Sequence, residues 1–199
     1  MRIQNIMKIS RLLPLFLLLS LIAVAQEVPS VLRPPKGSPV ALVVFEDLQC
    51  PQCARAAPLL NQASQTYKIP LVQHDFPLPM HNWSMNAAVI ARYFDTHSKT
   101  LGNAFRDYVF EHQREILPDN LRSYAEKFAA EHKVELPFVV DHAGKLSALV
   151  IADRDLGKSI NLDHTPTIYI VSDKKTATPY LEVKDLSQLY AMIDTMKRQ

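Results

Sequence analysis

The sequence predicts an α/β protein with a mixed central sheet, built in the order β-α-β, then a block of helices, then β-β-α. Two apolar stretches rich in β-branched residues, at 40–45 and 167–171, predict strands that are buried on both faces. A parallel pair joined by a crossover helix, together with a terminal antiparallel hairpin, makes a mixed sheet with helices on both faces.

The composition fits one folded domain with an ample core. The chain has 199 residues, of which 48% are hydrophobic, and its 22 Lys+Arg against 20 Asp+Glu give a formal net charge of +2. This balanced charge lacks the strongly basic footprint of a nucleic-acid-binding domain, so we expect no nucleic-acid partner. With only two cysteines, the chain is not a disulfide-rich miniprotein.

Residues 1–25 have the pattern of a secretory signal peptide. Three basic residues precede an apolar stretch at 12–24, and Ala23-Val24-Ala25 supplies a small-x-small cleavage pattern. An uncleaved membrane anchor is the alternative, although the stretch is shorter than the roughly 20 residues that span a bilayer. Cleavage would leave 19 basic and 20 acidic residues, a formal charge of −1. We therefore expect a periplasmic or otherwise extracytoplasmic protein, where disulfides persist.

The first half of the sheet follows a Pro-rich lead-in. Residues 26–39 contain four prolines and predict an extended segment without a fold of its own. After the first strand comes Cys50-Pro51-Gln52-Cys53, and helical apolar spacing then continues to about Tyr67, with Pro51 suited to a first helical position. Residues 69–76 are the second strand candidate.

From residue 82 to residue 161 the chain has helical patterns and no strong strand pattern. The expected helices and the elements that follow them are a helix from Asn82 or Ser84 to about His97, helices at 101–116, 119–133 and 145–160, strands at 167–171 and 180–183, and an amphipathic helix over 186–196.

The two cysteines form a C-x-x-C motif at the start of a helix. There the helix N–H groups are unpaired and the helix dipole is positive, which favours a thiolate at Cys50. Cysteines in such motifs have a pKa of roughly 3.5–7.5 instead of about 8.5. A thiolate stabilised in this way leaves readily, so the disulfide form is an oxidant. Because Cys53 lies one turn inside the helix, we assign Cys50 as the exposed, attacked sulfur and Cys53 as the buried resolving sulfur.

Two other roles for the cysteine pair stay open. A structural disulfide would close a loop too small for much entropic stabilisation. A metal-delivery module would use the two thiolates with His81 or His164 to bind zinc or copper. The sequence has no second cysteine pair and no H-x₃₋₅-H spacing, so we expect no metal site.

Three segments carry a resemblance to a known family. Phe45-Glu46-Asp47-Leu48-Gln49-Cys50-Pro51-Gln52-Cys53, followed by a helix, resembles the active-site segment of the thioredoxin superfamily, and more narrowly of the DsbA-like thiol:disulfide oxidoreductases. Asp75-Phe76-Pro77-Leu78 with His81 resembles that family's entry into its helical insertion. His164-Thr165-Pro166-Thr167-Ile168 resembles its cis-proline loop ahead of the third strand.

The resemblance implies both a fold and a chemistry. The fold is a thioredoxin domain formed by residues 40–81 and 162–199 around a helical insertion at 82–161. The Thr165–Pro166 bond is implied to be cis and to face the disulfide, which leaves the Thr165 backbone free to pair with an extended substrate chain. The implied partners are protein thiols and disulfides and a quinone-linked membrane protein that re-oxidises the pair; no organic cofactor is needed.

Two departures from the family's pattern bear on the activity. The strongest oxidants carry His between the cysteines, whereas neutral Gln52 supplies no cation to the thiolate, so we expect a less oxidising couple. The buried acid that often stands six residues before the first cysteine is replaced by Val44. Glu46 and Asp47 lie nearby on opposite faces of the strand, and we expect a solvated pair.

Three further side chains are candidates for the rim of the active site, namely His81, Trp83 and His164. His81 could instead mark a helix entry, and Trp83 could be a half-buried packing residue. His164 neighbours the expected cis-proline and could touch the disulfide.

We therefore expect an exported thiol:disulfide oxidoreductase that exchanges its Cys50–Cys53 disulfide with thiols of secreted proteins in the oxidising direction. One alternative keeps the fold and reverses the direction, as in a periplasmic reductase or isomerase; the other is the metal-delivery module. The familiar dimeric isomerases carry a separate N-terminal dimerisation domain, for which residues 26–39 are too few, so an isomerase of that architecture is disfavoured. We expect a monomer.

Overall fold

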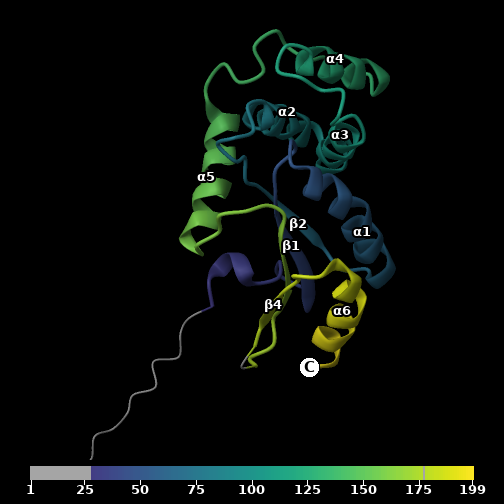
Figure 1. Ribbon diagram of the computed structural model, residues 1–199, viewed down its shortest axis with the longest axis vertical. Helices are drawn as coiled ribbons and strands as arrows, with labels where there is room; N and C mark the ends of the chain where they lie inside the picture. The colour runs from purple at the N-terminus through teal and green to yellow at the C-terminus, as the bar shows by residue number, and fades with distance from the viewer. Residues whose placement is uncertain (1–27, 177) are drawn as a thin grey trace, which may run out of the picture.

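A four-stranded mixed sheet forms the centre of the fold (Figure 1). The computed structural model describes residues 28–176 and 178–199, so the expected signal peptide at residues 1–25 lies outside the described residues. The strand order is β2-β1-β3-β4, with β1 parallel to β2 and antiparallel to β3, and β3 antiparallel to β4. The strands are β1 (Val40–Glu46), β2 (Leu71–Asp75), β3 (Thr167–Ser172) and β4 (Tyr180–Glu182). The predicted mixed sheet, with its parallel pair and terminal hairpin, is confirmed.

The α-helices begin and end close to the predicted positions. They are α1 (Pro51–Tyr67), α2 (Ser84–His97), α3 (Lys99–Glu111), α4 (Leu121–Glu131), α5 (Lys145–Ser159) and α6 (Leu189–Arg198), and the 3-10 helix η2 (Leu186–Gln188) precedes α6. The 3-10 helix η1 (Ser30–Leu32) corrects the prediction of an extended 26–39 segment, because Val31 and Leu32 pack into the core beside β1. The largest shift is at α3, which ends at Glu111 instead of continuing to residue 116, because the chain turns after His112.

Helices cover both faces of the sheet (Figure 1). Every residue of β1 is buried, and the alternation of its side chains divides them between two cores. Val40, Leu42 and Val44 pack with α1 and α6, whereas Val43 and Phe45 pack with η1 and α5. Because both faces are covered, β1 reads in the sequence as a continuous apolar run.

The chain between β2 and β3 forms the helices α2 to α5, three of which gather at one end of the sheet (Figure 1). A third core fills the space between α2, α3 and α4, where Phe94, Phe105 and Phe128 contact one another with ring centroids 4.8–5.2 Å apart. The same core continues to Cys50 and Cys53. The helical part therefore packs directly against the start of α1.

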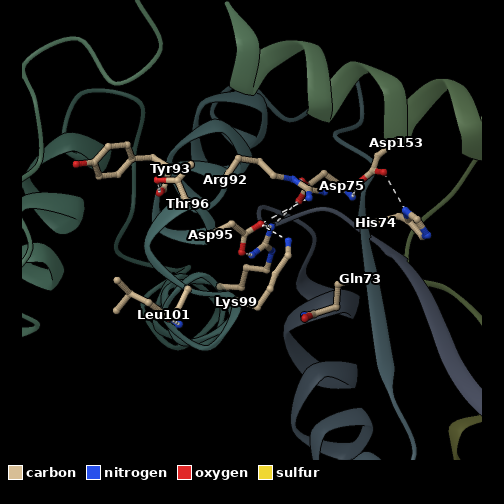
Figure 2. Close-up of polar contacts among 12 residues, drawn as sticks. Gln73, His74, Asp75, Arg92, Tyr93, Asp95, Thr96, Lys99, Leu101 and Asp153 are labelled. Atoms are coloured by element: carbon tan, nitrogen blue, oxygen red, sulfur yellow. Dashed lines mark hydrogen bonds and ion pairs between the residues drawn. The ribbon is translucent and has the colours of Figure 1, made fainter. Parts of the chain in front are cut away.

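A cluster of charged side chains joins these helices to the sheet (Figure 2). Arg92 on α2 pairs with both Asp75 at the end of β2 and Asp153 on α5. Arg106 on α3, only 2% exposed, pairs with Asp95 of α2 at 3.0 Å. We refer to these five residues as the charge cluster; it brings four elements together at the base of the helical part.

Within the described residues, no helix has both the length and the apolar character needed to cross a bilayer.

Candidate active site

The cysteine pair lies at the N-terminus of α1, as the sequence predicts. Cys50 is the N-cap residue, Pro51 occupies the first turn, and Cys53 follows one turn into the helix. The Cys50 amide donates to the Asp47 carbonyl at 2.9 Å, and the Cys50 carbonyl accepts from the Ala54 amide at 3.2 Å. Proline fits here because the first-turn amides of a helix have no partner within it.

Both cysteines are free thiols, and both are buried, with 5% of Cys50 and 1% of Cys53 exposed. The expectation of an exposed Cys50 is therefore wrong. The reason is that Cys50 packs in the same core as Leu48 and Trp83, and that its sulfur also contacts the loop before β3. Cys50 is still the more accessible of the two sulfurs.

The surroundings shift the pKa values of the two thiols in opposite directions. A hydrogen bond from the Cys53 side chain, together with the backbone amides of Gln52 and Cys53, lowers the pKa of Cys50 to about 5, although burial opposes this shift. Burial, followed by the interaction with Cys50, raises the pKa of Cys53 far above its usual range. The pair therefore combines one sulfur that ionises readily with one that stays protonated.

The Thr165–Pro166 bond is cis, as the family resemblance implies. The Thr165 carbonyl accepts a hydrogen bond from the Cys50 thiol at 3.3 Å, so the loop before β3 covers the reactive sulfur. The Thr167 hydroxyl donates to the His164 carbonyl at 2.9 Å and closes this loop on itself.

Asp47 is a buried organiser of the loop before Cys50, which corrects the expectation of a solvated carboxylate. The residue is 1% exposed, and its carboxylate accepts from the amides of Gln49 and Leu78, each at 2.7 Å. The same carboxylate contacts His81 Nδ1 at 2.8 Å. The Asp47 amide also points to the Cys53 sulfur at 3.4 Å. His81 thus supports the site through Asp47, and within the described residues it forms no hydrogen bond with either cysteine.

Glu46 is also buried, with 3% exposed, so the expectation of a solvated pair is wrong for both acids. Its side chain lies on the α1 face of the sheet and accepts from Gln73 Nε2 at 3.0 Å. Burial raises its pKa to about 8, while the charge of Arg106 acts in the opposite direction. Glu46 is close enough to Cys53 to contribute to that thiol's raised pKa. A buried carboxyl group therefore accompanies the resolving cysteine, although Val44 occupies the usual position.

The side chains of two glutamines connect the active-site segment to the helical part of the chain. Gln49 accepts from the Trp83 amide at 2.9 Å, which ties this segment to the start of α2. Gln113, in the turn after α3, donates to the carbonyls of Leu48 at 2.8 Å and Cys50 at 3.1 Å. Trp83 itself is buried in the core beside the cysteines, where the sequence suggested a half-buried position. Nothing in the sequence around Gln113 pointed to this role.

A groove of about 870 Å³ runs beside the pair. Its walls come from α1 and from the segment after β4, and Thr165 and Pro166 contribute to the cis-proline side. Gln52 and His164 also line it. His164 is exposed and contacts Asp163 at 2.8 Å, so it belongs to the groove rim instead of touching the sulfurs.

No group of three or more His, Cys, Asp or Glu side chains is arranged to hold a metal ion anywhere in residues 28–176 and 178–199. His81 is engaged by Asp47, and His164 by Asp163.

The geometry defines a class of protein: a thioredoxin fold with a C-x-x-C pair at a helix start, faced by a cis-proline loop. The family model described as Thioredoxin matches residues 35–194. The chain belongs to this family.

Solved structures share the fold. The alpha-DsbA1 protein of Wolbachia pipientis has a TM-score of 0.67 at 15% identity, over 85% of this chain and 92% of that one. A periplasmic thioredoxin-like protein of Salmonella enterica serovar Typhimurium has a TM-score of 0.64 at 19% identity, over 83% and 88%. The fold of the chain is thus that of the DsbA-like oxidoreductases within the thioredoxin superfamily.

A curated relative is much longer than this chain. It is the Na(+)/H(+) antiporter NhaA 3 of Salinispora tropica, which is 25% identical over 157 residues. The match covers 74% of this chain and 22% of the antiporter, so the chain spans about a fifth of the length of that relative.

Proposed function

We propose that the protein is an exported thiol:disulfide oxidoreductase that passes its Cys50–Cys53 disulfide to thiols of secreted proteins. The observation that carries the proposal is the placement of Cys50 at the N-terminus of α1, 3.3 Å from the Thr165 carbonyl of the cis-proline loop. In this setting the pKa of Cys50 is lowered to about 5 and that of Cys53 is raised. A stabilised Cys50 thiolate favours the reduced form of the pair, which makes the disulfide form an oxidant. The match to the thioredoxin family and the fold shared with the alpha-DsbA1 protein of Wolbachia pipientis support the same chemistry.

The proposed reaction has two exchange steps. A substrate thiolate attacks Cys50, the Cys50–Cys53 bond breaks, and Cys53 leaves with the electron pair and takes up a proton. A second substrate thiolate then attacks the substrate sulfur of the mixed disulfide. Cys50 leaves as the stabilised thiolate, the substrate acquires a disulfide, and the enzyme holds two reduced sulfurs.

Glu46 has a place in the first step. Its pKa of about 8 keeps it protonated near neutral pH, and it lies near enough to Cys53 to influence that thiol. A protonated carboxyl group within electrostatic range of the departing Cys53 can supply the proton that the buried thiolate needs, because an isolated charge in this core is costly. We assign Glu46 as the proton donor to Cys53 in the oxidising direction.

Recycling and export complete the proposal. A quinone-linked membrane protein would take the two electrons from the reduced pair, and the protein would act as a monomer outside the cytoplasm after cleavage of residues 1–25. The N-terminus of the exported protein tests the last point: we expect it at Gln26, and an intact residue 1–25 segment would mean a retained anchor.

The test of direction is the equilibrium of the Cys50–Cys53 pair with glutathione buffers. We expect a potential above that of thioredoxin, at about −270 mV, and below that of the strongest oxidant of this kind, at about −120 mV, because Gln52 adds no charge. A potential at or below thioredoxin's would instead indicate a reductase. A Cys50→Ser variant that kept full exchange activity would contradict the assignment of the attacked sulfur. Stoichiometric zinc or copper that blocked alkylation of Cys50 would favour metal delivery.

A further inference from the structure

The groove beside the cysteine pair carries charges that the exchange chemistry does not use. Arg55 projects from α1 and Lys184 from the segment after β4, and both line the groove. Both side chains are exposed, and neither forms an ion pair or hydrogen bond within the part of the chain that the structure describes. Glu182 is the single carboxylate among the described lining residues.

The rest of the groove suits an extended polypeptide. Leu59, Pro166, Ile168 and Leu186 supply apolar surface to its lining, and Leu59 is exposed. The volume of about 870 Å³ lies in the upper part of the range of ligand sites. Since Thr165 also contacts the Cys50 sulfur, a chain lying in the groove would bring its own sulfur to Cys50.

We propose that this groove binds the segment flanking the substrate cysteine and that Arg55 and Lys184 make it selective for segments with acidic side chains. The inference rests on the proposed exchange function and adds a substrate class to it. Two unpaired cations against one carboxylate give the groove a positive excess. Charge complementarity of this kind raises the rate of encounter and suppresses wrongly charged partners.

The charge selection acts on the first exchange step. The acidic segment is held in the groove while the substrate thiolate attacks Cys50 and Cys53 leaves, so the rate of forming the mixed disulfide depends on the flanking charge. No further redox partner is involved, because the electrons move only between the substrate sulfur and the Cys50–Cys53 bond.

The experiment compares three peptides, each with one cysteine followed by two Glu, two Gln or two Lys. The oxidised protein is mixed with each peptide, and the rate of mixed-disulfide formation is divided by the rate of the same peptide with glutathione disulfide. This division is needed because flanking charges also change the pKa of the peptide thiol. We expect the Glu peptide to react about three- to tenfold faster than the Gln peptide, and the Lys peptide to be slowest. The difference should shrink at about 0.5 M salt.

The variant Arg55→Gln with Lys184→Gln should remove the preference, so that the normalised rates of the three peptides agree within about twofold. The matched control is Lys127→Gln with Lys133→Gln, which removes the same charge from exposed positions on and after α4 and should keep the preference.

Equal normalised rates for the three peptides, a preference for Lys, or a preference that survives in the Arg55/Lys184 variant would each overturn the inference. Normal exchange with glutathione alongside such a result would leave the proposed function standing. Failure to exchange with any thiol, glutathione included, would overturn the proposed function and the inference with it.

Discussion

Glu46 is a carboxyl group enclosed by β1, β2 and α1, and its ionisation should be visible in the stability of the protein. Its pKa rises from 4.5 to about 8 on folding, so the folded state binds the proton more tightly than the unfolded state. Glu46 therefore favours the folded state most where its carboxyl group is neutral, and the free energy of unfolding decreases as the pH rises from about 4.5 through 8.

We expect Glu46→Gln to become more stable than the natural protein as the pH rises, by up to about 4 kcal/mol at pH 9 relative to the difference at pH 4.5. Urea unfolding of both proteins at a series of pH values measures this. A stability difference that stays constant with pH would show that Glu46 does not carry the raised pKa. The proposed role toward Cys53 predicts, separately, slower formation of the mixed disulfide near neutral pH in the same variant.

Gln113 connects the turn after α3 to the cysteine loop through two hydrogen bonds, to the carbonyls of Leu48 and Cys50. Replacing it by Met leaves the Leu48 carbonyl without this donor at similar side-chain volume. We expect Gln113→Met to lose about 1–2 kcal/mol of unfolding free energy. Gln65→Met, at an exposed position on α1, is the control and should change stability by less than about 0.5 kcal/mol. Equal losses in the two variants would contradict the positioning role.

The sequence could foresee the reactive pair because its parts are local. Cys50 and Cys53 stand one turn apart at a helix start, and the polarity of the helix end assigns their order. The partners of Asp47 and Gln113 are distant in the chain, and no periodic pattern encodes them. Two consecutive acids at the end of a strand, such as Glu46 and Asp47, are typical of a solvated pair. Their burial follows only from the tertiary packing around the end of β1, which the sequence does not reveal.

At the scale of elements, the charge cluster fixes the helical part to the sheet. Arg106 is nearly inaccessible to water and lies between Asp95 and Asp75. Its removal takes the more deeply buried positive charge away from two buried carboxylates, which then keep, among the described residues, only Arg92 and the exposed Lys99 as cationic partners. We expect Arg106→Met to lose about 3–5 kcal/mol of unfolding free energy.

The control for this prediction is Lys99→Met. Lys99 pairs with the same Asp95 at 2.8 Å, but its side chain is 71% exposed, so its loss should cost less than about 1 kcal/mol. Thermal and urea unfolding of both variants tests the contrast. Similar losses would mean that burial does not govern the strength of these pairs.

Most element boundaries were predictable to within a few residues, because strands and amphipathic helices have their own periods. Strand β1 and helix α6 have the plainest patterns, one continuously apolar and the other striped. The charge cluster was not predictable, since Arg92, Arg106 and Asp153 are individually ordinary charges on helices that the sequence does not place relative to one another. The cis bond before Pro166 came from family resemblance alone.

At the scale of the whole molecule, the ionised Cys50 should contribute to the stability of the reduced protein. Its pKa falls from 9.0 to about 5 on folding, so the contribution is complete above pH 9 and disappears as the pH falls through 5. We expect the free energy of unfolding of the reduced protein, compared with that of a Cys50→Ala variant, to increase from pH 5 to pH 8. At pH 7 the difference between the two proteins should be about 2 kcal/mol larger than at pH 5.

Urea unfolding under a reducing agent measures this difference. The pH dependence that other groups such as Glu46 contribute is common to both proteins and cancels when the two are compared. A difference between the two proteins that did not change between pH 5 and pH 8 would contradict the low pKa of Cys50.

The pairing of β1 with β3 determines the order in which the sheet can form during synthesis of the chain. Phe45 pairs with Thr167 and Val40 with Ser172, so the middle of the sheet joins segments separated by the whole helical part. A chain made from its N-terminus can form the β1-α1-β2 unit early, but β3 reaches it only near the end of synthesis. Until then Thr165 cannot cover Cys50, and the nascent chain carries its two thiols without the loop that later guards them.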